Sequence, residues 1–177
     1  MRTLAAILFA LIVCAPLTLA AQKQKREPLT DAQQELIAEA GIDPVARVGL
    51  YVRFINERSD TIAGLIKRAH SAARSHRIDS ELQDFSALMD ELGDNLDVYS
   101  ERKADVRKSL KALNDSIAHW QSVLHELPSE PGFELSLKDA LGSAGELAEQ
   151  AKQLTTDQEA YFKAHPDEKG QDRYEPK

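Results

Sequence analysis

The chain has 177 residues, with 29 acidic against 22 basic side chains and a formal net charge of −7 at pH 7. Net negative charge repels nucleic acid and anionic lipid, so the sequence predicts neither as a partner. The single cysteine, Cys14, lies in a segment that we expect to be removed, which would leave the mature protein without disulfides, thiolate catalysis or cysteine-ligated metals.

Residues 1–20 have the layout of a secretory signal peptide. Arg2 gives a positive start, an apolar run extends over residues 4–13, and the small-x-small triplet Thr18-Leu19-Ala20 precedes a polar stretch. Cleavage is expected between Ala20 and Ala21. An uncleaved anchor is the alternative, but the apolar run is shorter than the roughly 20 residues that a membrane span needs. The sequence therefore predicts a periplasmic or secreted protein with no stable membrane insertion after signal removal.

Capping signals organise the start of the mature chain. Residues 21–29 are polar and without periodicity, so we expect a flexible lead-in. Thr30 with Gln33, or Asp31 with Gln34, has the spacing of a capping box, which predicts a short helix that Gly41 ends. Asp43-Pro44 then opens a second helix, because aspartate caps helix N-termini and proline suits the first helical position.

The second helix is expected to run from Pro44 to about His76. Its apolar residues recur in steps of three and four, which is the spacing of one helix face. Arg77-Ile78-Asp79-Ser80 then provides a short connection with good capping residues. Short connections join antiparallel neighbours, so this helix and the next are predicted to form a hairpin.

A third and much longer helix is predicted up to Leu127. One row of side chains follows it at an average spacing of 3.5 residues: Leu82, Phe85, Met89, Leu92, Leu96, Tyr99, Lys103, Val106, Leu110, Leu113, Ile117, Trp120, Leu124 and Leu127. This helix would be about 70 Å long. Lys103, the one interruption, either fixes the register of the partners or extends its ammonium group to water. Gly93-Asp94-Asn95 are weak helix formers at which the helix could instead bend.

The last helix follows the helix-breaking segment 127–132, which contains two prolines. It is expected from Phe133 to Phe162. Residues 165–177 are charged and interrupted by proline and glycine, so we predict a disordered tail. Residues 30–164 are thus expected to form one all-α domain, an elongated antiparallel three-helix bundle of coiled-coil type with a short extra N-terminal helix.

No catalytic, cofactor or metal site is predicted. Metal ligands on one helix face lie three or four residues apart, and none of the histidines has this spacing to another: His70, His76, His119, His125 and His165. Asp115 and His119 have suitable spacing but no further ligand beside them, so a surface ion pair is the simpler interpretation. The serines lack the Gly-x-Ser-x-Gly context of an activated nucleophile. We therefore expect that the protein is not an enzyme.

Two segments share the pattern Leu-Thr-x-x-Gln, namely residues 29–33 and 154–158. In these ten residues and in its expected compartment, the chain resembles a family of small all-helical periplasmic stress chaperones that carry paired motifs of this form. The chain departs from that family in its acidic charge and in having the two copies near opposite ends. Thr-x-x-Gln is also the pattern of a capping box.

The unequal lengths of the expected helices predict an interaction surface. One end of the long helix has a single partner, so Phe85, Leu88, Met89 and Leu92 are expected to be under-covered and to contact a second copy or another protein. Coverage by a helix bend or by the C-terminal tail is the alternative. We expect an exported, non-enzymatic helical-bundle protein that acts in the cell envelope by protein–protein interaction or self-association. The alternative function is a periplasmic chaperone or stress adaptor that binds unfolded clients.

The signal layout predicts that the exported protein begins at Ala21. N-terminal sequencing of protein recovered from the envelope or the medium measures this directly. Material that retains residues 1–20, or that carries lipid on Cys14, would contradict the prediction.

Overall fold

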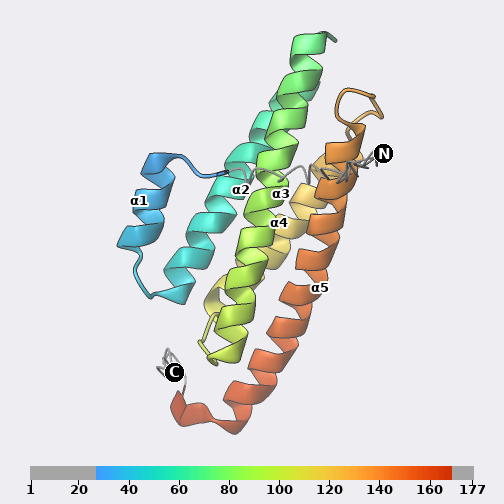
Figure 1. Ribbon diagram of the computed structural model, residues 1–177. Helices are drawn as coiled ribbons and strands as arrows, with labels where there is room; N and C mark the ends of the chain where they lie inside the picture. The colour runs from blue at the N-terminus through green and yellow to red at the C-terminus, as the bar shows by residue number, and fades with distance from the viewer. Residues whose placement is uncertain (1–26, 169–177) are drawn as a thin grey trace, which may run out of the picture.

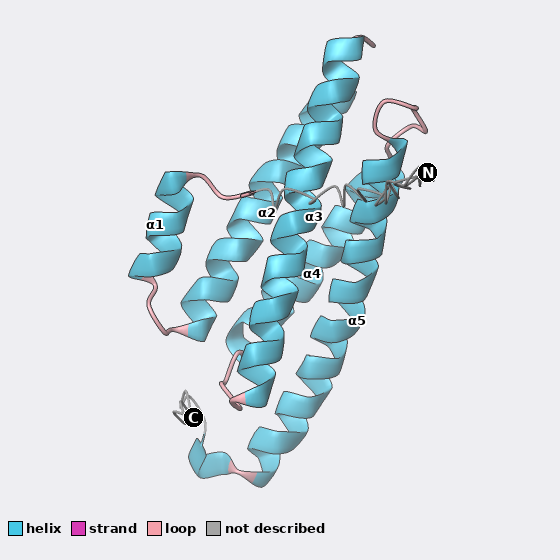
Figure 2. Ribbon diagram, viewed as in Figure 1, coloured by secondary structure: helices cyan, strands magenta, loops and turns pink. Residues whose placement is uncertain are grey.

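The computed structural model describes residues 27–168. Within this range all regular structure is helical (Figure 2): α1 (Asp31–Glu39), α2 (Pro44–Ile66), α3 (Ala72–Glu101), α4 (Arg107–His125), α5 (Glu134–Ala164) and the 3₁₀ turn η1 (Pro166–Glu168). The predicted all-α class is confirmed. The cleavage site at Ala20 and Ala21, residues 21–26 of the lead-in and residues 169–177 of the tail lie outside the described residues.

The four long helices form a bundle made of two hairpins. Figure 1 shows α2 and α3 as one antiparallel hairpin, α4 and α5 as the second, and α1 beside α2 at the edge of the bundle. α2 packs against α3 and α4, and α5 packs against the same two helices. The consecutive helices α3 and α4 therefore occupy opposite corners. Between the hairpins, α2 lies beside α4 and α3 beside α5, and each of these pairs runs in the same direction.

The predicted single helix up to Leu127 is wrong, because the chain turns at residues 102–106 and forms α3 and α4 instead. Lys103 has a left-handed backbone, with φ of 56°. The N–H of Ala104 donates to the carbonyl of Tyr99 (2.9 Å), and the N–H of Lys103 donates to the carbonyl of Ser100 (3.2 Å). These two bonds form a Schellman motif, which satisfies the last carbonyls of α3. The bundle consequently has four long helices and not three.

A buried glutamine on α5 holds this turn in place. Gln158 is 5% exposed. Its Nε2 donates to the carbonyl of Ala104 (2.6 Å), and its Oε1 accepts from the N–H of Val106 (3.1 Å). Both backbone groups belong to buried residues outside any helix, where an unpaired polar group would be costly. One side chain therefore supplies the hydrogen bonds that the turn itself cannot make.

The alternative bend at Gly93-Asp94-Asn95 is also absent, since α3 passes through this segment without a break. Gly93 instead lies where α3 and α5 approach each other. Gln150 Nε2 donates to the carbonyl of Gly93 (3.0 Å), and a Cβ added to Gly93 would lie 3.0 Å from Gln150 Oε1. Glycine thus permits a close contact between two neighbouring helices of the bundle.

The first hairpin turns earlier than predicted, because α2 ends at Ile66 and α3 begins at Ala72. Ser71 caps α3 by accepting from the backbone N–H of Arg74 (3.2 Å). The Arg74 guanidinium donates to the carbonyls of Ile66 and Arg68 (both 3.3 Å), which lie at the end of α2. The predicted connection, residues 77–80, lies inside α3. A serine cap and an arginine that binds carbonyls replace the glycine or proline expected of a turn.

The other predicted helix ends are confirmed. Thr30 and Gln33 form both hydrogen bonds of a capping box at the start of α1. Gly41 has a left-handed backbone (φ 57°) directly after the end of α1. Asp43 Oδ1 accepts from two backbone N–H groups of α2, whose first residue is Pro44. The proline-containing segment separates α4 from α5.

Replacing Leu113 by alanine should lower the free energy of unfolding by about 2–5 kcal/mol, because its side chain is fully buried in α4 and truncation leaves a cavity. Leu135→Ala is the matched control. Leu135 is 72% exposed at the start of α5, so its truncation should change stability by less than about 0.5 kcal/mol. Urea unfolding followed by circular dichroism measures both. Equal losses would show that Leu113 is not a core residue.

Candidate functional site

The structure places the predicted interaction residues in the core. Phe85, Leu88, Met89 and Leu92 are each at most 1% exposed, so the expectation that they are under-covered is wrong. The physical reason is the turn at residues 102–106, which brings α4 and α5 back along α3. Trp120 of α4 meets Phe85 edge to face, with ring centroids 6.1 Å apart. These four residues therefore stabilise the fold and present no surface.

Two of the polar groups considered as ligands, Asp115 and His70, have structural partners. Lys111 Nζ binds Asp115 at 2.8 Å, and His70 Nε2 lies 3.2 Å from Glu130. Within residues 27–168, no three His, Cys, Asp or Glu side chains gather as metal ligands would. None of the helices in the same range is both long and apolar enough to cross a membrane.

The most distinctive surface is the basic end of the α2–α3 hairpin, which lies at the top of Figure 1. Residues 61–78 contain four Lys and Arg and two His but no acidic residue, although the chain as a whole carries −7. Lys67, Arg68 and Arg77 are exposed there. We call residues 61–78 the basic end. Its positive charge stands out against an acidic molecule and favours anionic groups.

One arginine of the basic end is committed to the fold. Arg74 forms an ion pair with Glu130 of the α4–α5 loop, and its side chain is only 8% exposed. Ser75 Oγ donates to the same carboxylate (2.8 Å). The hydrogen bond from Arg74, followed by that from Ser75, holds the pKa of Glu130 below its usual range. A Cβ on Gly132 would lie 2.9 Å from Ser75 Cβ, so the loop lies directly against α3.

The buried carboxylate of Glu81 orients the exposed Arg77. Glu81, with its side chain 7% exposed, accepts from Arg58 Nη1 (3.0 Å) and from Arg77 Nε (3.2 Å). Arg58 Nη2 also donates to the carbonyl of Pro28, which links the lead-in to the bundle. Arg77 remains 65% exposed. Its guanidinium is thus held at one edge and open to solvent at the other.

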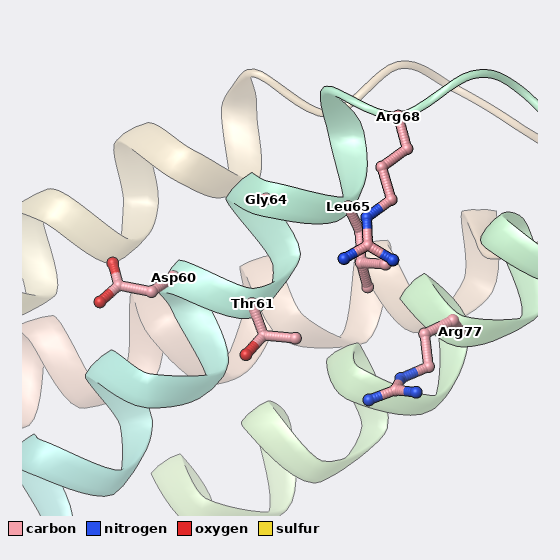
Figure 3. Close-up of a pocket in the computed structure, with 6 residues that line it drawn as sticks. All are labelled: Asp60, Thr61, Gly64, Leu65, Arg68 and Arg77. Carbon is pink, nitrogen blue, oxygen red and sulfur yellow. The ribbon is translucent and has the colours of Figure 1, made fainter.

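Arg77 and Arg68 border a hollow of about 450 Å³ between the two helices of the hairpin. Figure 3 shows the guanidinium of Arg68 beside Leu65, with Arg77 extending from α3 toward the same space. The full lining is Asp60, Thr61, Gly64, Leu65, Arg68 and Arg77. A Cβ added to Gly64 would have no atom within 4 Å, so the space beside this residue is open. Two planar guanidinium groups at one hollow suit a carboxylate or phosphate, which they can bind through paired hydrogen bonds.

The sequence contained a signal for this surface that total charge concealed. An acid-free run of eighteen positions with four cations is visible in residues 61–78, but it was divided between an expected helix and an expected connection. The convergence of Arg68 and Arg77 depends on the turn at residues 67–71, whose position was mispredicted. Charge counted in windows, and not over the whole chain, would have identified the basic end.

The second Leu-Thr-x-x-Gln segment has a structural role. Leu154 lies in the core, Thr155 accepts from Asn114 of α4 (3.3 Å), and Gln158 binds the turn between α3 and α4. Comparison of the chain with family models, curated proteins and solved structures gives no significant match.

Glu130→Gln should lower the melting temperature at pH 7, because the ionised carboxylate is the form that Arg74 and Ser75 stabilise. A depressed folded-state pKa contributes stability above the unfolded value, and that stability is lost as pH falls through the folded value. The difference between wild type and variant should therefore shrink below the ordinary glutamate pKa of about 4.3.

Glu149→Gln on the exposed face of α5 is the matched control. Melting curves of the three proteins at neutral and acidic pH decide the point. The same pH dependence for both variants would rule out a special role for Glu130.

Proposed function

We propose that this is an exported, non-enzymatic protein of the cell envelope that binds an acidic segment of a partner protein at the basic end. The observation that carries the proposal is the hollow bordered by Arg68 and Arg77, which belong to a segment, residues 61–78, without an acidic residue. The expected export, and with it the envelope location, rests on the signal layout of residues 1–20.

The charge distribution favours an acidic polypeptide over a membrane or a nucleic acid. Those partners present extended negative surfaces, which would face the whole acidic molecule and be repelled by it. An acidic segment of a protein can contact the basic end without approaching the rest of the molecule. Leu65 and Thr61 also line the hollow beside the guanidinium groups. They can contact the residues that neighbour the bound carboxylate in the partner segment.

Pre-organisation supports binding at this end. Glu81 holds Arg77 at Nε, and the Arg74–Glu130 pair anchors the start of α3 to the α4–α5 loop. Side chains that are already ordered lose less entropy when a ligand binds, so more of the interaction energy appears as affinity. Glu81 and the Arg74–Glu130 pair therefore order the site without contacting the ligand.

Replacing Arg68 and Arg77 together by glutamine should weaken binding of a fluorescein-labelled glutamate-rich peptide by about ten-fold or more, because two charge-assisted contacts are lost. Fluorescence anisotropy at low salt measures the affinity, and added salt should weaken wild-type binding. Lys111→Gln with Lys152→Gln is the matched control: it removes the same charge from exposed positions on α4 and α5 and should have less than about two-fold effect.

Vesicles of phosphatidylglycerol and phosphatidylcholine form the second arm of the experiment. The proposal expects the peptide to bind and the vesicles not to sediment the protein. Equal weakening by both variant pairs, or binding to the vesicles but not to the peptide, would overturn it.

A further inference from the structure

The link between α3 and α4 combines features that favour exchange between two copies of the chain. It is short, it joins opposite corners of the bundle, and it depends on a left-handed lysine, Lys103. A lysine in this conformation is strained by its Cβ, whereas glycine would not be. Short links under strain promote domain swapping, because straightening relieves the strain.

Nothing in the sequence of the link opposes a continuous helix. No glycine or proline occurs between Gly93 and Pro128, and residues 101–107 consist of residues that helices tolerate. The apolar row at 3.5-residue spacing also continues across the link, from Tyr99 to Val106 and Leu110. A straightened α3–α4 segment would therefore carry one apolar face along its length, interrupted only at Lys103.

The contacts of the bundle fall into two sets, those within a hairpin and those between hairpins, and this division permits two chains to exchange a hairpin. α3 and α4 lie at opposite corners of the bundle and meet through the rings of Phe85 and Trp120, a contact that a second copy can also supply. The contacts of α2 with α3 and of α4 with α5 stay within their hairpins. The helix contacts between hairpins, namely α2 with α4, α3 with α5 and Phe85 with Trp120, are broken, and a second copy can restore them.

We infer that two copies of the chain exchange their α4–α5 hairpins through a straightened link at residues 102–106. Each half of the dimer is then one four-helix bundle with the contacts described above, built from two chains. In Figure 1 the link and the basic end lie at opposite ends of the bundle. The exchanged dimer is consequently an extended rod with one basic end at each tip.

The closed monomer is favoured by side chains around the link. Gln158 binds the turn through Ala104 and Val106. Arg107 lies over the ring of Phe162 (4.4 Å), and Lys103 lies over that of Tyr161 (5.6 Å). These contacts oppose the strain of Lys103, so single substitutions should shift the balance in either direction.

The test measures dimer content by size-exclusion chromatography with light scattering after refolding at low and high protein concentration. Wild type should form a dimer that increases with concentration during refolding. Lys103→Gly relieves the strain and should lower the dimer fraction by about five-fold or more. Lys103→Ile, which makes the left-handed backbone less favourable, and Gln158→Leu, which removes the clamp, should raise it.

Crosslinking distinguishes an exchanged dimer from surface association. In a Cys14→Ser background, Asp97→Cys and Gln150→Cys place one thiol on each hairpin, where the two native side chains are hydrogen bonded (2.6 Å). A short bis-maleimide should link two chains in the dimer fraction and one chain in the monomer fraction. The control pair Asn114→Cys and Thr155→Cys lies within the α4–α5 hairpin and should give links within one chain in both fractions.

Two results would overturn the inference. One is a protein that stays monomeric after refolding at every concentration, with Lys103→Ile and Gln158→Leu also monomeric. The other is a dimer in which the Asp97–Gln150 pair forms links within single chains only.

Discussion

The hydrogen bonds between Gln158 and the turn at residues 102–106 determine the architecture of the bundle. They satisfy a carbonyl and an N–H that the turn buries, and they do so from a helix more than fifty residues away in sequence. Without this pairing, the turn would leave two buried backbone groups without partners, and a continuous helix would be the better solution for the backbone. Because the chain turns there, α4 and α5 return along α3, and Phe85 and its neighbours are buried instead of exposed.

At the opposite end of the bundle, where α2 turns into α3, ion pairs hold the turn in place, and not hydrogen bonds from a glutamine amide. Glu130 binds Arg74 of α3, and Glu81 binds Arg58 of α2 and Arg77 of α3. Together they fix the start of α3 relative to α2 and to the α4–α5 loop. Lys67, Arg68 and the outward side of Arg77 remain exposed at that end. The charges that hold the fold together and those of the proposed binding site therefore lie in one small region.

Local chemistry predicted the elements whose ends carry a recognisable cap. Thr30 with Gln33, Gly41 and Asp43-Pro44 all act as the sequence indicates, and the two prolines separate α4 from α5. The turn at residues 102–106 could not be predicted, because lysine occupies the position where glycine is usual and the apolar spacing continues across it. Its partner, Gln158, acts through tertiary contact, which local patterns do not contain. The candidate site was missed for a related reason, since it requires the correct position of the α2–α3 turn as well as charge.

The division into hairpins also determines how the chain reaches its fold. Contacts within each hairpin join residues close in sequence and can form early. Contacts between hairpins join distant residues. An example is the hydrogen bond from Trp120 Nε1 to Asn56 Oδ1, across 64 positions (2.6 Å). Closing such long loops costs more entropy than forming a local turn, so we expect docking of the hairpins to be the slow step of folding. Trp120 is the single tryptophan and lies at that late-forming contact. Its fluorescence therefore reports the rate of docking, separately from helix formation seen by far-ultraviolet circular dichroism.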